Sequence, residues 1–236
     1  MDALTSTFRS GDLMRSRSVS AVVRSAVVDI PIPPTRLLAD WQREISLQLG
    51  LETGDIETLP LARTRLRWPQ LRRCFDAVEQ WMAALGLPAV LSSSEVALMA
   101  SRGTTYHHDG AYYGSAAFCN VFLSEDSGTD FHFPAAGHRI ALVRGTAVMF
   151  DPCQPHAIIK RGATGFDEAD FAPEQMRPQV FLTWELPIEQ DDVKRALGIT
   201  FDIAPVTSSQ CHGEQVWRNG APVKLCPKTG GWVIQP

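Results

Sequence analysis

The sequence lacks any apolar run that approaches the roughly eighteen residues of a membrane-spanning helix, so no membrane association is expected. It also lacks an excess of basic residues, since 22 Lys and Arg stand against 26 Asp and Glu and give a net charge of −4. A nucleic-acid-binding protein should carry a basic stripe, and nucleic acid is therefore not an expected partner. No internal repeat is visible.

Cysteines are few and scattered, and their number is odd: Cys74, Cys119, Cys153, Cys211 and Cys226. A disulfide framework usually shows an even number of cysteines at regular spacings. We therefore expect reduced thiols and a cytoplasmic location. Cys211, His212 and Cys226 are residue types that bind metals, but without a C-x-x-C spacing they do not predict a structural zinc site.

With 236 residues, the chain is long enough for one large hydrophobic core or two small ones. Residues 1–20 are rich in Ser and Arg and are expected to lack fixed structure. A β-branched stretch predicts a strand over residues 19–32. Apolar residues spaced by three and four predict helices over residues 35–49 and 69–85. Residues 21–90 are thus expected to form a strand and supporting helices.

From residue 91 onward, short apolar runs separated by turn residues replace the helical pattern. This pattern predicts short strands, which we place at residues 95–101, 116–123, 130–133, 139–143, 147–150, 156–160 and 180–186. Strands of this number and spacing are typical of an antiparallel sandwich or jelly roll. The predicted fold class is α+β, mainly β, with the N-terminal helices covering one sheet.

Two segments lie outside this regular pattern. Residues 162–176 are long and mixed in composition, which predicts a mobile loop of the kind that often lies over a site. Its Asp167, Glu168, Asp170 and Glu174 indicate either a polar or basic substrate or a solvated acidic loop. Residues 187–236 form a C-terminal extension of the same domain, with a short helix near residues 191–197 and a hairpin at residues 216–220.

The chemistry is carried by His107 and Asp109, two residues apart, and by the distant His156. On an extended strand the first two side chains lie on one face. With a second histidine from another strand they form the two-His-one-carboxylate set of non-haem Fe(II) oxygenases. Alternatively, His107 and Asp109 are a hydrogen-bonded pair on a turn, and His156 is a buried histidine bonded to backbone.

Four segments, in order, resemble the prolyl-hydroxylase-like branch of the Fe(II)/2-oxoglutarate dioxygenases and cover roughly residues 93–186. They are His107-x-Asp109, residues 121–123 with the hairpin 128–134, residues 144–151 followed by Pro155-His156, and Arg177 ahead of residues 180–184. Two departures matter. Arg177 follows His156 by 21 positions, where the family usually has its basic residue about ten positions on, and the register is one residue off when Trp184 is aligned with the family's tryptophan. In addition, Thr129 stands where the family often has a second glycine.

The resemblance implies a double-stranded β-helix whose catalytic and metal-binding residues are His107, Asp109 and His156. It implies Fe(II), 2-oxoglutarate as co-substrate and ascorbate as a candidate reductant. Arg177 would bind the far carboxylate of 2-oxoglutarate, because the guanidinium fork suits a carboxylate. Thr183 would be a second donor, with Arg161 and Lys160 in reserve for Arg177. The expected reaction is hydroxylation of an amino-acid-like, peptidyl or small-molecule substrate with release of succinate and CO2.

Two alternatives remain open at this point. One is a non-catalytic jelly-roll binding module with a vestigial metal site, and the other is a cupin-like metalloenzyme that does not use 2-oxoglutarate. His108 is expected to face away from His107, while His132 is either structural or directed at substrate.

Overall fold

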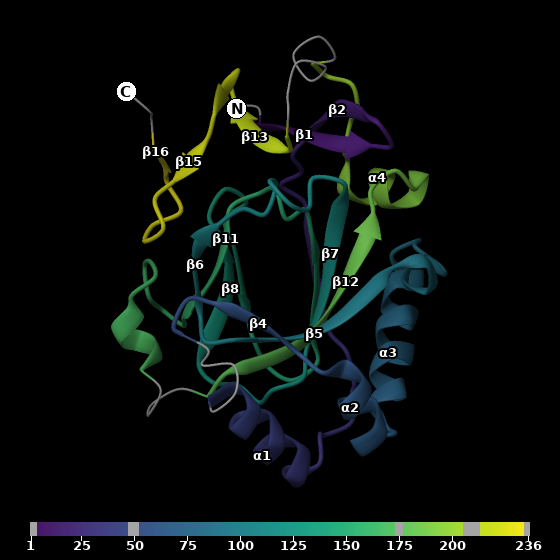
Figure 1. Ribbon diagram of the computed structural model, residues 1–236, viewed down its shortest axis with the longest axis vertical. Helices are drawn as coiled ribbons and strands as arrows, with labels where there is room; N and C mark the ends of the chain where they lie inside the picture. The colour runs from purple at the N-terminus through teal and green to yellow at the C-terminus, as the bar shows by residue number, and fades with distance from the viewer. Residues whose placement is uncertain (1–3, 47–51, 173–176, 205–212, 234–236) are drawn as a thin grey trace.

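The computed structural model describes residues 4–46, 52–172, 177–204 and 213–233, and its centre is two facing antiparallel sheets (Figure 1). The larger sheet consists, in spatial order, of β3 (Val23–Val27), β10 (Thr146–Phe150), β7 (Ala116–Phe122), β12 (Gln179–Pro187), β5 (Glu95–Ser101) and β4 (Ile56–Leu59). The smaller sheet consists of β6 (Thr104–His107), β11 (His156–Lys160), β8 (Thr129–Phe133) and β9 (His138–Ala141).

Strands β5 to β12 show how the chain winds. At each step the chain passes from one sheet to the other, except at the β8–β9 hairpin. This winding is that of a double-stranded β-helix. The predicted fold class and the predicted fold are both confirmed.

The outer face of the larger sheet is covered by α1 (Thr35–Glu44), α2 (Leu61–Arg67) and α3 (Leu71–Ala84) (Figure 1). On α3 the buried residues Leu71, Cys74, Val78 and Met82 recur at spacings of three and four, which places them on one stripe. They pack in one cluster with Leu182 and Trp184 of β12. Each fully buried large apolar side chain contributes about 1.5–3 kcal/mol, so the helices are held by this contact.

The space between the sheets contains a second apolar cluster. Alternation along a strand sends neighbouring residues to opposite faces, so Phe181 of β12 lies between the sheets while Leu182 contacts the helices. Phe131, Phe133 and Phe150 join it there, with ring centroids of Phe131 and Phe133 4.6 Å apart and those of Phe133 and Phe150 5.1 Å apart.

The expectation that residues 1–20 lack fixed structure is wrong for the part described. β1 (Leu4–Ser10) and β2 (Leu13–Ser18) form a hairpin, and β1 also pairs with β13 (Gln215–Arg218), which continues into β14 (Ala221–Pro222). The partner strand lies some 200 residues away in sequence, as the pairing of Thr7 with Gln215 shows. A local composition could not indicate such a contact.

The remaining elements follow the expectations in part. α4 (Asp191–Leu197) and the β13–β14 hairpin occur where predicted, while α2, η2 (Val90–Ser93) and the small pair of β15 (Lys224–Leu225) and β16 (Trp232–Val233) were not foreseen. Within the predicted loop 162–176, residues 168–171 form a 3-10 turn, η3 (Glu168–Phe171). Residues 47–49 of the predicted first helix and residues 173–176 lie outside the described part. No helix in the described part is long and apolar enough to cross a membrane.

Candidate metal centre

Three side chains converge where β6 and β11 meet. His107 is the last residue of β6 and stands directly opposite His156, the first residue of β11. Asp109 follows β6, and its carboxylate oxygens lie 3.7 Å from Nε2 of His107 and 3.3 Å from Nε2 of His156. One ligand atom from each residue lies within 4.8 Å of the others. The separations of 3.3 and 3.7 Å suit ligand atoms that each lie about 2.0–2.2 Å from a shared ion.

The orientation of both imidazoles also suits a metal ion. Nδ1 of His107 lies 2.7 Å from the carbonyl oxygen of Thr105, and Nδ1 of His156 lies 2.9 Å from that of Gln154. A carbonyl can only accept a hydrogen bond, so Nδ1 carries the proton in each ring and Nε2 offers a lone pair. The residues therefore fit a divalent ion.

The protonation states agree with this geometry. Burial, together with the nearby His156, lowers the pKa of His107 to about 4. Burial alone would raise the pKa of Asp109, but the neighbouring histidines, His156 first, outweigh that effect and leave it below its usual value. A neutral imidazole and an ionised carboxylate are the forms that bind a metal.

A buried ion pair fixes the loops that carry the ligands. Arg17 of β2 and Asp151, which follows β10, are both 0% exposed and make two hydrogen bonds of 2.6 and 3.0 Å. Arg17 Nε also donates to the carbonyl oxygen of Gly114 at 2.7 Å. The backbone N–H of Asp109 donates to the carbonyl oxygen of Pro152 at 2.9 Å. Arg17 thus ties the N-terminal hairpin to the segments that follow Asp109 and precede His156.

Sequence reasoning missed Arg17 entirely. It stands in a Ser- and Arg-rich stretch whose composition resembles a solvated terminus. Its role depends on a contact across 134 positions, which no local pattern reveals.

The two residues predicted to bind 2-oxoglutarate lie on β12 or just before it. Thr183 is half-buried on β12 and lies opposite Asn120 of β7; it shares the inner face with Phe181, two residues earlier. Arg177 is exposed and lies two residues before β12 begins. The assignment of both residues to the co-substrate stays a prediction.

The two reserve cations have other partners. Arg161 makes hydrogen bonds of 2.9 Å to the carboxylates of Asp126 and Asp130. Lys160 donates to Asp170 at 2.8 Å. Both side chains therefore already neutralise carboxylates of the smaller sheet and its adjoining loops.

Two further histidines, His132 and His108, and the set of Cys211, His212 and Cys226 are also residue types that bind metals. Nδ1 of His132 lies 2.5 Å from the hydroxyl oxygen of Tyr106, which favours the structural interpretation of His132. His108 is half-buried beside Asp109, and Cys226 is a free, half-buried thiol. Cys211 and His212 lie outside the described residues.

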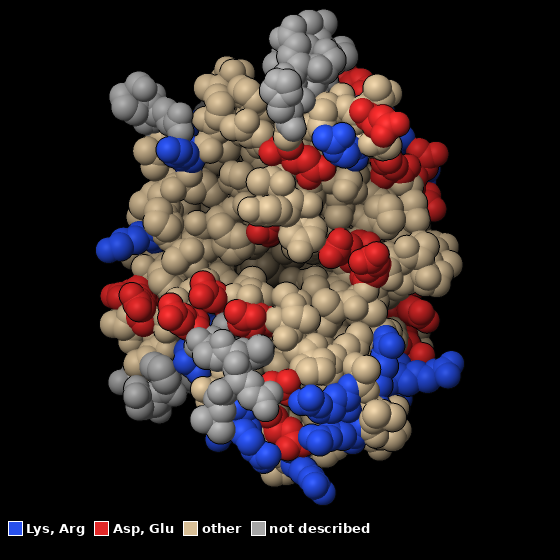
Figure 2. All heavy atoms as spheres, viewed as in Figure 1, with Lys and Arg blue, Asp and Glu red and all other residues tan. Residues whose placement is uncertain are grey.

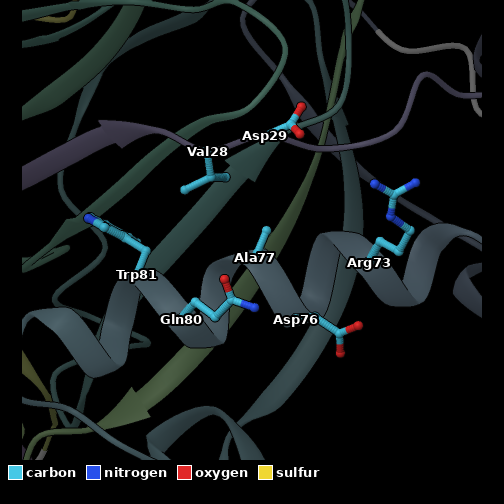
Figure 3. A pocket seen from close by; sticks show the side chains of 7 residues that line it. All are labelled: Val28, Asp29, Arg73, Asp76, Ala77, Gln80 and Trp81. Atoms are coloured by element: carbon cyan, nitrogen blue, oxygen red, sulfur yellow. The ribbon is translucent and has the colours of Figure 1, made fainter.

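A separate groove of about 530 Å³ lies along α3, lined among others by Asp29, Arg73, Asp76 and Trp81 (Figure 3). Its residues come from α3 and from the segment after β3, on the helix-covered side of the larger sheet. It contains none of the triad and is not part of the metal centre.

No family model matches the chain, and no curated protein matches it. Among solved structures, the chain is similar to the viral collagen prolyl hydroxylase vCPH from Paramecium Bursaria Chlorella virus-1, with a TM-score of 0.42 and 10% identity over 70% of this chain and 89% of that one.

Two further structures are similar to a comparable extent. EvdO2 from Micromonospora carbonacea var. aurantiaca gives a TM-score of 0.40 and 14% identity over 73% of this chain and 86% of that one. The non-heme alpha ketoglutarate dependent epimerase SnoN from nogalamycin biosynthesis gives a TM-score of 0.34 and 13% identity over 86% of this chain and 92% of that one. The fold assignment itself is made on the sheet topology described above.

Proposed function

We propose that this protein is an Fe(II)- and 2-oxoglutarate-dependent oxygenase, a hydroxylase of an amino-acid-like, peptidyl or small-molecule substrate. One observation carries the proposal. His107, Asp109 and His156 meet within 4.8 Å at the strand ends of a double-stranded β-helix, with Nε2 of both histidines directed toward the carboxylate of Asp109. Two histidines and one carboxylate on one face of an ion leave adjacent positions for other ligands, and this is the ligand set of non-haem Fe(II) oxygenases.

When bound, Fe(II) and 2-oxoglutarate would supply the oxidation, in which 2-oxoglutarate and O2 become succinate and CO2 and one oxygen atom enters a substrate C–H bond. The three ligands would hold the ion with a net charge of +1, which suits a dianionic co-substrate. Phe150 and Phe131 pack against His156 with ring centroids 5.1 and 5.7 Å away. These rings keep water from the inner side of the site and hold the imidazole in place.

The proposal assigns the far carboxylate of 2-oxoglutarate to Arg177, with the hydroxyl of Thr183 as a second donor. The position of Thr183 on the inner face of β12 supports its assignment as a donor. Arg177 precedes the same strand and would have to turn inward from its exposed position.

A second candidate is a metal-dependent enzyme on the same fold that does not use 2-oxoglutarate. The placement of the cations favours it, since Arg177 is exposed while Arg161 and Lys160 pair with carboxylates. A far carboxylate without a cation would be bound weakly, because a charge-assisted hydrogen bond is roughly twice as strong as a neutral one.

The experiment that separates the two uses the whole protein. Fe(II) and 2-oxoglutarate are added without oxygen, and a weak charge-transfer band in the visible spectrum is expected. Air and ascorbate are then admitted and succinate is measured, with the His156→Ala variant as the control that should give neither signal. A folded protein that binds Fe(II) but shows no band and no succinate would refute the proposal and leave the second candidate.

A further inference from the structure

Two carboxylates face each other on the inner face of the larger sheet. Glu185 of β12 stands directly opposite Glu95 of β5 and, on its other side, opposite Phe118 of β7. Glu185 shares this face with Phe181, which lies between the sheets. Like charges directly opposite each other on neighbouring strands destabilise a sheet. Among the described residues neither carboxylate has an ion-pair partner, so the fold tolerates an uncompensated pair here.

This acidic pair borders the same space as the metal centre. A series of ring contacts connects them: His156 to Phe150 at 5.1 Å, Phe150 to Phe118 at 5.8 Å, and Phe118 to Tyr113 at 4.9 Å. The backbone N–H of Tyr113 in turn donates to the carbonyl oxygen of Asp109 at 2.9 Å, and Phe118 stands opposite Glu185 on the neighbouring strand. These contacts connect the acidic pair to a residue of the metal centre. In Figure 2 this face of the molecule is hollowed near its centre, and acidic side chains border the hollow.

Asn120 provides an independent observation on the same wall. It lies two residues along β7 from Phe118, opposite Thr183, and is 5% exposed. Its Oδ1 atom is buried and has no hydrogen-bond partner among the described residues. A buried acceptor without a partner costs about 1–3 kcal/mol. Such an atom, directed into the space between the sheets, indicates that a donor from a ligand is missing.

We propose that Glu95, Glu185 and Asn120, here called the acidic wall, bind a cationic nitrogen of the substrate, an alkylammonium or guanidinium group. All three offer acceptors, and the half-exposed ring of Phe118 adds an aromatic face of the kind that attracts cations. The inference rests on the proposed function, since it names the substrate class of the same site. A basic amino acid, a free amine and a basic peptide side chain all share this chemistry.

The test uses the full chain loaded with Mn(II) and no 2-oxoglutarate, so that bound ligands are detected by paramagnetic broadening of their proton NMR lines. The probes are Nα-acetyl-arginine amide, its neutral isostere Nα-acetyl-citrulline amide, and agmatine as a free amine. We expect the arginine probe to bind about tenfold tighter than the citrulline probe, since a charge-assisted bond is lost in the latter. Agmatine keeps the guanidinium and adds a second cationic group, so binding of agmatine at least as tight as that of the arginine probe is expected and supports recognition of a cationic nitrogen. Equal binding of the charged and neutral isosteres, or no binding of either, overturns the inference.

Glu185→Gln and Glu95→Gln should each weaken the binding of the arginine probe about tenfold. Glu79→Gln, an exposed residue of α3, is the matched control and should leave binding unchanged. Both wall variants should also raise the melting temperature slightly, because each substitution removes like-charge repulsion. If the carboxylate instead stabilised the fold through a structural partner, its substitution would lower the melting temperature. Unchanged binding in both wall variants also overturns the inference.

The outcome is separable from that of the proposed function. Charge-selective binding with no succinate under Fe(II), 2-oxoglutarate and air refutes the oxygenase alone. Succinate release without charge-selective binding refutes the acidic wall alone.

Discussion

His156 stands directly opposite His107 in the antiparallel pair of β6 and β11, with ring centroids 4.4 Å apart. Immediately after this pair the register shifts between His156 and Ile158, as at a β-bulge, which bends a strand and redirects its side chains. The two imidazoles are thus held by strand ends rather than by free loops. A site on such rigid elements is better preorganised than one on loops.

The first prediction concerns the ligands themselves. His156→Ala removes one of three ligands and should weaken Mn(II) or Zn(II) binding by at least about 100-fold, since even loss of an outer-shell partner costs 10–100-fold. His138→Ala, an exposed histidine of β9, is the control and should bind one ion as before. Isothermal titration calorimetry gives both affinity and stoichiometry. An unchanged stoichiometry in His156→Ala would show that the ion binds elsewhere.

The second prediction concerns stabilisation by the metal. An ion that binds only the folded state at 100 times its dissociation constant adds about 2.7 kcal/mol, so Zn(II) should raise the melting temperature by several degrees and EDTA should reverse the shift. Asp109→Asn weakens the site by removing the charged ligand, and the shift should largely vanish. Differential scanning fluorimetry measures it. A full shift in this variant would contradict the assignment of Asp109.

The third prediction concerns the buried ion pair. Arg17→Met leaves Asp151 charged and buried, and breaking a buried pair in this way costs about 3–5 kcal/mol. Arg15→Met on the same strand removes contacts with the partly exposed Glu189 and Asp202, each worth at most about 1 kcal/mol, and cation–π contacts with Phe201 and Phe8, each worth about 0.5–1 kcal/mol at an exposed site. Urea unfolding of both variants measures the difference. Equal losses in the free energy of unfolding would show that the buried ion pair of Arg17 stabilises the fold no more than the surface contacts of Arg15.

A companion variant separates positioning from stability. Arg17→Met/Asp151→Asn removes both charges, so part of the stability should return, because replacing both partners costs less than removing one. The affinity for the metal should be lower than in the parent protein in both Arg17 variants, since neither would hold Gly114 and the loop before His156. Calorimetric affinity equal to that of the parent protein would refute a positioning role.

The fourth prediction concerns the co-substrate. If Arg177 binds the far carboxylate of 2-oxoglutarate, Arg177→Ala should raise the 2-oxoglutarate concentration for half-maximal succinate release by about tenfold or more, because a charge-assisted pair is lost. Arg36→Ala, at an exposed arginine of α1, should change nothing. An unaltered requirement in Arg177→Ala, with a raised one in Arg161→Ala, would transfer the role to Arg161.

Much of the fold could be predicted from the sequence because it depends on local patterns. The spacing of Leu71, Cys74, Val78 and Met82 marks the buried side of α3, and alternation marks the strands of the larger sheet. Asn219 and Gly220 predicted the tail hairpin, and both take positive φ values there, 50° and 81°. The N-terminal hairpin escaped prediction because its strand partner lies at the opposite end of the chain.

The sequence by itself determined the kinds of ligand, since two histidines and a carboxylate at these positions carry lone pairs and charge whatever the fold. Only the tertiary structure decided which groups meet. Strand register set His107 against His156 and Glu95 against Glu185, and a contact across 134 positions buried Arg17 against Asp151. Register and burial depend on the packing of whole sheets, so these pairings cannot be read from the residues on either side of them.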